Sequence, residues 1–201
     1  LAFGPGLRPN VETLKLLQAL TNGVIIPVVV DAGGLGALAL AIDALQHKKA
    51  PLILTPHPGE MARLTGNEIA KVQQERWQLA ADKAIEWNSV VVLKGANTVI
   101  ALPSGEIFIN PTGNPVLSTA GTGDLLTGLI ASLLAQGLQP EEAAICGVYL
   151  HRLAADMLVA GSGERGFMAG DILDLFPRAL NETAELFSNK PGDFFWIRPY
   201  H

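Results

Sequence analysis

The sequence predicts an α/β fold in which helices cover both faces of a mostly parallel β-sheet. Short apolar segments rich in β-branched residues alternate with longer segments of helical composition, an order typical of parallel strands joined by crossover helices. The apolar segments are continuous rather than alternating, as expected for strands buried on both faces. The 201 residues, 49% of them hydrophobic, suffice for one core, so we expect a single domain over residues 1–201.

Three strands are predicted in the first half of the chain. They cover residues 24–31, 51–55 and 90–94, and a glycine or a polar turn follows each of them. Segments 37–47 and 68–87 lie between these strands and have helical composition and spacing. This order predicts that the three strands are parallel to one another.

The following segments predict a hairpin and two helices. Residues 98–102 and 106–109 flank the turn at 103–105, whose Pro-Ser-Gly sequence predicts an antiparallel edge of the sheet. Leucine and isoleucine then recur at helical spacing over 125–137. A further helix is predicted to begin near Pro140 and to end near residue 160, with small residues that allow close packing.

The composition argues against several classes of protein. Fourteen basic and nineteen acidic residues give a net charge of -5, so no broad positive surface for nucleic acid is expected. The single cysteine, Cys146, excludes an intramolecular disulfide and a multi-thiolate zinc site, and it fits a reducing, cytoplasmic compartment. Apolar stretches such as 129–135 are shorter than the ~20 residues of a bilayer span, so we expect no membrane contact. The chain begins at Leu1 without methionine, and we expect an N-terminal portion to be missing.

A glycine-rich segment leads directly into the helix predicted at 125–137. Gly121 and Gly123 allow backbone N–H groups to approach an anion, and the helix dipole adds about half a positive charge there. A phosphate group fits such a site. Asp124 lies at the start of the helix, where its carboxylate can accept a proton from a bound hydroxyl group. The alternative is that Asp124 only caps the helix.

Lys94 follows an apolar strand and precedes Gly95. Ligands of parallel α/β sheets bind at the carboxyl ends of the strands, where a lysine can contact phosphate oxygens and a glycine lets the backbone approach. The alternative is a surface lysine whose aliphatic stem covers apolar side chains. Beside a glycine-rich helix start, this segment favours a nucleotide site.

His57 stands between two prolines after the strand at 51–55, and Glu60 follows within the same motif. The prolines stiffen the backbone around the imidazole, and Glu60 can face the same cleft or an ion. The prolines and Gly59 can equally shape a loop and begin a helix. This motif by itself leaves both interpretations open.

Two common nucleotide-binding motifs are absent from the sequence. The segment 31–36 lacks the G-x-G-x-x-G order, so a Rossmann fold for hydride transfer is not supported. No lysine follows a glycine, which excludes a P-loop. We interpret the remaining histidines and the aromatic residues as solvent-facing, packing or docking residues: His47, His151, Trp77, Trp87 and residues 194–196.

Together these motifs resemble those of the NAD(P)H-hydrate dehydratase family, repair lyases with a ribokinase-like fold. Four motifs stand in the family's order: Gly-Pro-Gly-Leu at 4–7, Asp31 at a strand end, Thr-Pro-His-Pro-Gly-Glu at 55–60, and 92–96 leading to Gly-Thr-Gly-Asp at 121–124. The similarity extends from about residue 3 to residue 171. The motif at 55–60 is more specific than the one at 121–124, because related vitamin kinases usually have asparagine in place of His57.

The resemblance implies a reaction in which ADP or ATP phosphorylates the hydroxyl of a hydrated nicotinamide ring, so that elimination restores NADH or NADPH. Asp124 would be the base at that hydroxyl. Mg²⁺ is implied as a cofactor, and Glu60 occupies the position suited to hold it through water. The resemblance implies that the substrate is bound by Gly6, His57 and Asp124. The implied nucleotide-binding residues are Lys94, Gly95, Ala96, Asn97, Thr98 and Gly123. The implied anion hole consists of Gly121, Thr122 and Gly123.

The chain departs from the family's pattern near the implied substrate. Gly33 and Gly36 stand where family members usually have an acid and an amide, and Val116-Leu117 replace an expected Gly-Met. These changes remove polar groups on the substrate side and leave the nucleotide side intact. Nucleotide binding is therefore better supported than the identity of the substrate.

The resemblance also implies partners and leaves two alternatives open. We expect hydrated NAD(P)H and an adenine nucleotide as ligands, assembly into a homo-oligomer, and association or fusion with an NAD(P)H-hydrate epimerase. The first alternative is a kinase for a small hydroxylated metabolite, since phosphoryl transfer alone needs the same glycine-rich helix start and base. The second is a nucleotide-binding protein without turnover.

Overall fold

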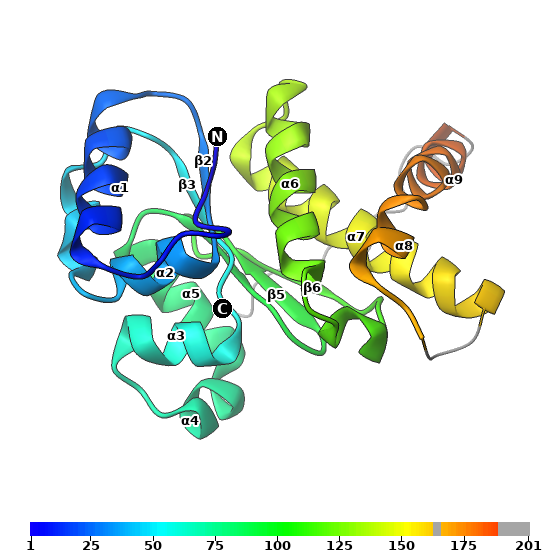
Figure 1. Cartoon of the computed structure of the whole chain (residues 1–201), viewed down its shortest axis with the longest axis horizontal. Helices are drawn as coiled ribbons and strands as arrows, with labels where there is room; N and C mark the ends of the chain where they lie inside the picture. Colours follow the sequence, from blue (N-terminus) through cyan, green and yellow to red (C-terminus); the bar gives the residue numbers. More distant parts are fainter. Residues whose placement is uncertain (163–165, 189–201) are drawn as a thin grey trace.

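The computed structural model describes residues 1–162 and 166–188 and shows a mixed β-sheet between two layers of helices (Figure 1). Within these residues the sheet has six strands in the order β1 to β6. Strands β1 to β4 are parallel, and β4 to β6 are antiparallel. This confirms the predicted α/β fold with its antiparallel hairpin. The strands are β1 Ala2–Phe3, β2 Val28–Val30, β3 Leu52–Leu54, β4 Val90–Leu93, β5 Thr98–Ala101 and β6 Ile107–Asn110.

The two helical layers cover opposite faces of this sheet (Figure 1). One layer consists of helices that precede β4: α1 Val11–Gly23, α2 Ala32–Leu38, η1 Ile42–His47, α3 Pro58–Thr65, α4 Ile69–Gln74 and α5 Arg76–Glu86. The other consists of elements that follow β6: η2 Pro115–Ser118, α6 Thr122–Ala135, α7 Pro140–Ser162, α8 Ala169–Leu173 and α9 Phe176–Ser188.

Both faces of the parallel strands are buried, because successive side chains of a strand point to opposite faces. Val28 and Val30 of β2 pack into the core formed with the first helical layer. Val29 of the same strand and Ile53 of β3 pack into the core formed with the second layer. A strand between two apolar cores needs apolar residues at every position, which explains the continuous apolar segments.

Two predicted helices have different boundaries in the structure. The sequence predicts one helix over 37–47, but α2 ends at Leu38 and the 3-10 helix η1 follows at Ile42–His47. The carboxylate of Asp31 accepts a hydrogen bond from the N–H of Ala32, so α2 begins directly after β2. The predicted helix over 68–87 is divided into α4 and α5 at Glu75, whose φ of -109° and ψ of 26° leave the helical range.

Helix α1 is a third difference, because the sequence predicts no helix before β2. Asn10 caps its start by accepting a hydrogen bond from the N–H of Thr13 at 2.9 Å, and Leu14 and Leu17 face the core. Strand β2 is also shorter than the predicted 24–31. The aromatic segment 194–196 lies outside the described residues.

Helix α7 is long and apolar enough over Pro140–Gly161 to cross a membrane, by length and composition alone. Half of this segment is buried inside the structure, where α7 packs against α6, β3, β4 and β5. Gly147 allows the close approach of α6, because a Cβ at this position would lie 2.6 Å from Cγ1 of Ile130. These contacts are those of a core helix.

Candidate functional site

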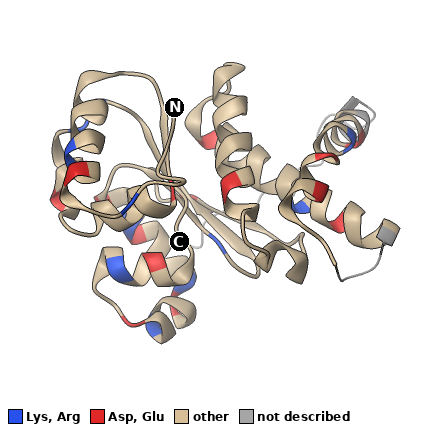
Figure 2. Ribbon diagram, viewed as in Figure 1, with Lys and Arg blue, Asp and Glu red and all other residues tan. Residues whose placement is uncertain are grey.

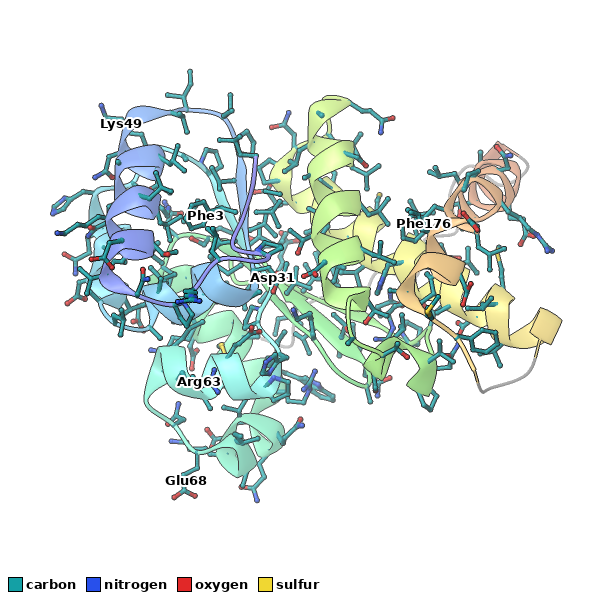
Figure 3. The ribbon with its side chains drawn as sticks, viewed as in Figure 1. Phe3, Asp31, Lys49, Arg63, Glu68 and Phe176 are labelled. Atoms are coloured by element: carbon teal, nitrogen blue, oxygen red, sulfur yellow. The ribbon has the colours of Figure 1, made fainter. Side chains whose placement is uncertain are left out.

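Three polar side chains follow the carboxyl ends of neighbouring parallel strands. Asp31 follows β2, His57 follows β3 by a short loop, and Lys94 follows β4. Ends of parallel strands meet at one edge of a sheet, which is where ligands bind in α/β folds. Asp31 lies near the middle of the molecule, between α2 and α6 (Figure 3). The structure therefore brings three of the motifs found in the sequence to one place.

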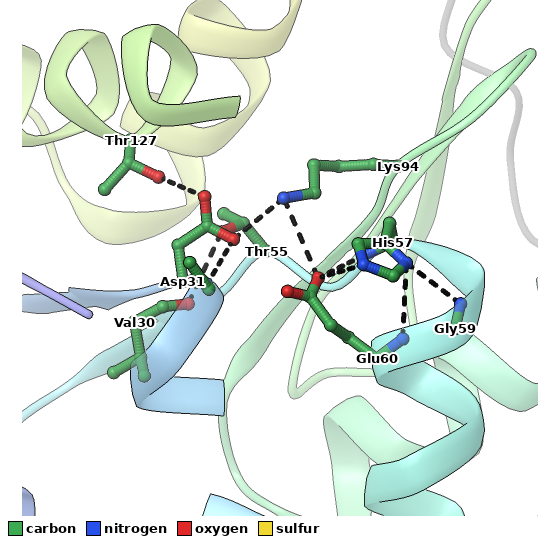
Figure 4. A network of polar contacts seen from close by, with 9 residues as sticks. Val30, Asp31, Thr55, His57, Gly59, Glu60, Lys94 and Thr127 are labelled. Atoms are coloured by element: carbon green, nitrogen blue, oxygen red, sulfur yellow. Dashed lines mark hydrogen bonds and ion pairs between the residues drawn. The ribbon is translucent and has the colours of Figure 1, made fainter. Parts of the chain in front are cut away.

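Asp31 is the centre of a polar network (Figure 4). Its side chain is buried, and one carboxylate oxygen lies 2.8 Å from Nζ of Lys94. The other accepts a hydrogen bond from the hydroxyl of Thr127 on α6 at 2.7 Å. The backbone N–H of Ala32 donates to the carboxylate as well, at 2.8 Å. The carboxylate thus joins β2, α2, α6 and the end of β4.

His57 and Glu60 form the start of helix α3. The N–H of His57 donates to Oε2 of Glu60 at 2.8 Å, and Nδ1 of His57 accepts from the N–H groups of Gly59 and Glu60 at 3.0 and 3.3 Å. This capping box confirms that the motif begins a helix. Because Nδ1 accepts these bonds, the neutral imidazole carries its proton on Nε2. The ring itself is half exposed, and it remains available to a ligand.

Lys94 reaches from β4 toward the start of α6. Its ammonium group lies 3.9 Å from Oε2 of Glu60 in addition to its contact with Asp31. A Cβ at Gly123 would lie 3.4 Å from this Nζ atom, so the ammonium group lies against the first turn of α6. The lysine charge and the helix dipole therefore act at the same point.

The first turn of α6 is open in the way that anion binding requires. Gly121, with φ of +90°, is the N-cap, and no side chain caps the helix. The interpretation of Asp124 as the cap is therefore wrong: Asp124 lies within the first turn and is exposed. Thr122 instead secures the preceding loop, because its hydroxyl donates to the carbonyl oxygens of Leu117 and Thr119 at 2.7 and 2.9 Å.

A cavity of about 400 Å³ connects this helix start with the loop after β4. Its lining includes Lys94, Gly95, Ala96 and Thr98 from the loop and Thr122 and Gly123 from α6. The structure thus brings together most of the residues predicted to bind a nucleotide. Asn97 lines a neighbouring groove beside α5. Gly6, in the loop after β1, and Asp124 are not among the residues that line the 400 Å³ cavity.

Helix α7 supplies two further cavity residues: Arg152, which no sequence motif indicates, and His151, which the sequence predicts only as a solvent-facing or packing residue. Arg152 donates hydrogen bonds to Gly95 in the loop after β4 and to Thr112 in the loop after β6. His151 is only 5% exposed, and burial lowers its pKa from 6.5 to about 4. A backbone hydrogen bond with Thr122 opposes this shift, while the charges of Arg152 and Lys94 add to it. The sequence indicates only that Arg152 and His151 belong to a helix whose small residues allow close packing, and not that they line a cavity.

The described residues include no group of three or more His, Cys, Asp and Glu side chains that could hold a metal ion. Oε2 of Glu60 accepts the hydrogen bond of His57 and faces the ammonium group of Lys94. One oxygen of this carboxylate is therefore already bonded within the protein. Figure 2 shows that α1 and α3 each have both a basic and an acidic residue, whereas α6 has only an acidic one.

The chain matches the family model for NAD(P)H-hydrate dehydratase over residues 1–178. It is 51% identical over 185 residues to a bifunctional NAD(P)H-hydrate repair enzyme of Moorella thermoacetica, covering 92% of this chain and 35% of that protein. It is 38% identical over 178 residues to an ADP-dependent (S)-NAD(P)H-hydrate dehydratase of Bacillus subtilis, covering 89% of this chain and 62% of that one. The chain thus spans between a third and two thirds of the length of these relatives.

The fold is also similar to that of a solved NAD(P)H-hydrate dehydratase structure. The ADP/ATP-dependent NAD(P)H-hydrate dehydratase from Bacillus subtilis, co-crystallized with ATP/Mg²⁺, superposes with a TM-score of 0.80 at 35% identity. The match covers 90% of this chain and 63% of that chain. Hydroxyethylthiazole kinase from Pyrococcus horikoshii shares the fold, with a TM-score of 0.63 at 21% identity.

Proposed function

The chain belongs to the NAD(P)H-hydrate dehydratase family, and from this we propose that it restores NADH or NADPH from their hydrated forms with ADP or ATP as phosphoryl donor. The observation that carries the proposal is the start of α6. This helix start has no side-chain cap, and its first turn contains the exposed residue Asp124. The ammonium group of Lys94 lies against the same turn, at Gly123. Phosphoryl transfer needs positive electrostatics and a base, and this turn supplies both.

Asp124 is the base of the proposed reaction. Its carboxylate accepts the proton of the ring hydroxyl while the hydroxyl oxygen attacks the terminal phosphorus of the nucleotide. The bond from that phosphorus to the nucleotide breaks, which releases AMP or ADP. Loss of the phosphate, together with a proton from the neighbouring ring carbon, then restores the double bond of the reduced nicotinamide. The N–H groups of Gly121 and Gly123 stabilise the charge on the moving phosphoryl group, whereas the N–H of Thr122 already donates to the carbonyl oxygen of Thr119 at 3.3 Å.

We assign the 400 Å³ cavity to the adenine nucleotide. The loop after β4 and the loop after β6, with Gly113 and Asn114, form two opposing walls, and the start of α6 closes one end, so a nucleotide held there points its phosphates at Gly123. The ammonium group of Lys94 lies at this same glycine. Gly6 and the exposed edge of His57 are our proposed contacts for the hydrated nicotinamide ring.

We propose that Mg²⁺ arrives with the nucleotide phosphates, because the described residues offer no metal cage of their own. The relative from Bacillus subtilis was co-crystallized with ATP/Mg²⁺, which supports this. Contact of Glu60 with the ion through water stays a prediction. When bound, the ion neutralises charge on the phosphate oxygens.

We also propose that the protein forms a homo-oligomer and acts together with an NAD(P)H-hydrate epimerase. Support for the second point comes from relatives named bifunctional repair enzymes, in Moorella thermoacetica and in Thermofilum pendens. The chain spans 35% and 36% of those two proteins.

Recovery of reduced-nicotinamide absorbance tests the proposed function. Hydrated NADH or NADPH is incubated with the protein, Mg²⁺ and either ADP or ATP. We expect Asp124→Asn to lower kcat by a factor on the order of 10² to 10⁴, because the amide cannot accept the hydroxyl proton.

Product analysis separates the alternatives. A stable phosphorylated product without recovery of the reduced ring would mean that the protein is a kinase. Nucleotide binding without any turnover would mean a binding protein. Equal activity of the wild type and Asp124→Asn would contradict the role of Asp124.

A further inference from the structure

Arg152 on α7 bonds to both loops that flank the 400 Å³ cavity. Its Nη1 donates to the carbonyl oxygen of Gly95 and to the hydroxyl of Thr98, each at 3.0 Å. Its Nε donates to the carbonyl oxygen of Thr112 in the loop after β6. One guanidinium group therefore joins the loop after β4 to the loop after β6.

Asp156 supports the same arrangement from the next turn of α7. Its two carboxylate oxygens accept hydrogen bonds from the N–H of Gly113 and from the amide of Asn114, both at 2.9 Å. Gly113 has a φ of +102°, and a Cβ there would overlap the guanidinium group of Arg152. The loop after β6 thus lies directly on Arg152. The carbonyl oxygen of Thr112 bonds to Arg152 and the N–H of Gly113 bonds to Asp156, both on α7.

The loop after β4 receives a second arginine from the opposite side. Arg76 at the start of α5 donates to the carbonyl oxygens of Leu93 and Lys94 at 3.1 and 3.3 Å. With Arg152 on Gly95, three successive carbonyl groups of this loop are bonded to guanidinium groups. Arg76 ties this loop to Gln73 on α4, to which its Nη1 donates at 2.9 Å, whereas Arg152 ties it to the loop after β6.

The chemistry of Arg152 suits a fixed spacer. A guanidinium group is planar and presents its donors in a rigid fork, so it fixes the separation of its acceptors, which a lysine ammonium cannot do. Burial lowers the pKa of Arg152 and the nearby Arg76 adds to this shift, while the charge of Asp156 opposes it. The hydrogen bonds to Thr98 and Thr112 are partly buried, where a charged donor is less screened by water.

We propose that Arg152 is a positioning residue that sets the affinity for the nucleotide by holding the two walls of the cavity at a fixed separation. The inference rests on the proposed function in one respect, namely that the cavity takes the adenine nucleotide. Gly95 and Thr98 are predicted nucleotide contacts, and both are bonded to Arg152. Asp124 lies on α6 and His57 caps α3, and the hydrogen bonds of Arg152 go to Gly95, Thr98 and Thr112, so loss of Arg152 should leave the chemical step and the hydrate site in place.

Steady-state kinetics of Arg152→Ala and Arg152→Lys test this inference. Arg152→Ala should raise the KM for ATP by a factor on the order of ten or more, because three hydrogen bonds to the walls are lost. The kcat and the KM for hydrated NADH should change less than about threefold. Arg152→Lys should lie between the wild type and the alanine variant, since lysine keeps the charge but cannot span both loops. Arg178→Ala, which removes an exposed arginine on α9, is the matched control and should behave as the wild type.

Hydrogen exchange gives a readout that does not need activity. We expect faster amide exchange in both 95–98 and 112–114 in Arg152→Ala, and no change in Arg178→Ala. Unchanged exchange or an unchanged KM for ATP in a folded Arg152→Ala would overturn the inference. So would a lysine variant with wild-type KM, because charge alone would then suffice. An inactive wild type would instead contradict the proposed function, and the exchange data would still decide the role of Arg152.

Discussion

Asp31 has more bonded partners than any other side chain in the polar network of Figure 4, and these partners lie on separate elements. A buried carboxylate is stable only when its lone pairs are bonded and its charge is paired. Lys94, Thr127 and the N–H of Ala32 meet both requirements. Asp31 therefore fixes the position of Lys94 relative to α6, and through it the electrostatics of the anion site.

Gly33 is needed for a close contact between α2 and the loop after β1. A Cβ at this position would lie 1.9 Å from the carbonyl oxygen of Leu7, which cannot be accommodated without movement of the backbone. Gly33→Ala should therefore lower the free energy of unfolding by about 1–3 kcal/mol. It should also raise the KM for the hydrate, since the loop that carries Gly6 must move. Urea unfolding and steady-state kinetics measure the two effects.

Gly128→Ala is the control for this substitution. Gly128 lies in α6, and a Cβ there would meet no atom within 4 Å. Alanine is the better helix former, so we expect stabilisation by roughly 0.5–1 kcal/mol. A Gly33→Ala protein as stable as the wild type would show that the loop after β1 does not rest on α2 as the structure has it.

His151 should make the protein sensitive to acid. Its pKa is about 4 in the folded state, against 6.5 as the ordinary value. Between these values the unfolded chain binds a proton that the folded protein does not, so stability falls as the pH falls from about 6.5 to 4. The full effect is about 3 kcal/mol. Above pH 6.5 the histidine is neutral in both states and contributes no pH dependence.

Unfolding free energies at several pH values check this prediction. The difference between wild type and His151→Asn isolates the contribution of the histidine, because all other titrating groups are common to both proteins. The difference should change by about 3 kcal/mol between pH 7.5 and pH 4. A constant difference over this range would show that the imidazole is not buried as a neutral group.

At the scale of elements, the starts of α3 and α6 differ in a way that suits their proposed roles. Helix α3 is closed by the capping box of His57 and Glu60. Helix α6 begins at Gly121 without a side-chain cap, which leaves its start open to a ligand. The capped helix holds a residue of the proposed hydrate site, and the uncapped one binds the proposed phosphoryl group.

Substitutions of Glu60 test the capping role. Glu60→Gln keeps an oxygen that can accept from the N–H of His57, so it should stay within about 1 kcal/mol of the wild type. Glu60→Ala removes the acceptor and should cost about 1–2 kcal/mol. Denaturant unfolding of both variants measures this. An equal loss in both would mean that the negative charge facing Lys94, rather than the cap, stabilises the structure.

At the scale of the whole molecule, the sheet separates two apolar cores, and the site lies at the edge where the parallel strands end. The first helical layer supplies His57 and Glu60, and the second supplies Asp124 and Arg152. Asp31 and Lys94, at the ends of β2 and β4, connect the two layers through Thr127 and Glu60. The proposed reaction thus takes place between the layers, where residues from both can contact one ligand.

The sequence alone determined the alternation of strands and helices, the hairpin at β5 and β6, and the motif residues that follow each strand. These features depend on apolar periodicity and on glycine and proline, which act through near neighbours in the chain. Helix boundaries were less predictable. The chain leaves the helical conformation at Ala41, between α2 and η1, and at Glu75, between α4 and α5, and no composition rule specifies either residue.

Only the tertiary structure decided which side chains meet. Thr127 is 96 residues from Asp31, Lys94 is 63 residues from Asp31, and Arg152 is 57 residues from Gly95. Such pairs leave no local pattern, because their energy comes from burial and from partners that chain folding brings together. For the same reason the sequence indicated an anion site at Gly121–Gly123 but could not show that Lys94 lies against it, or that α7 forms the far wall of the cavity.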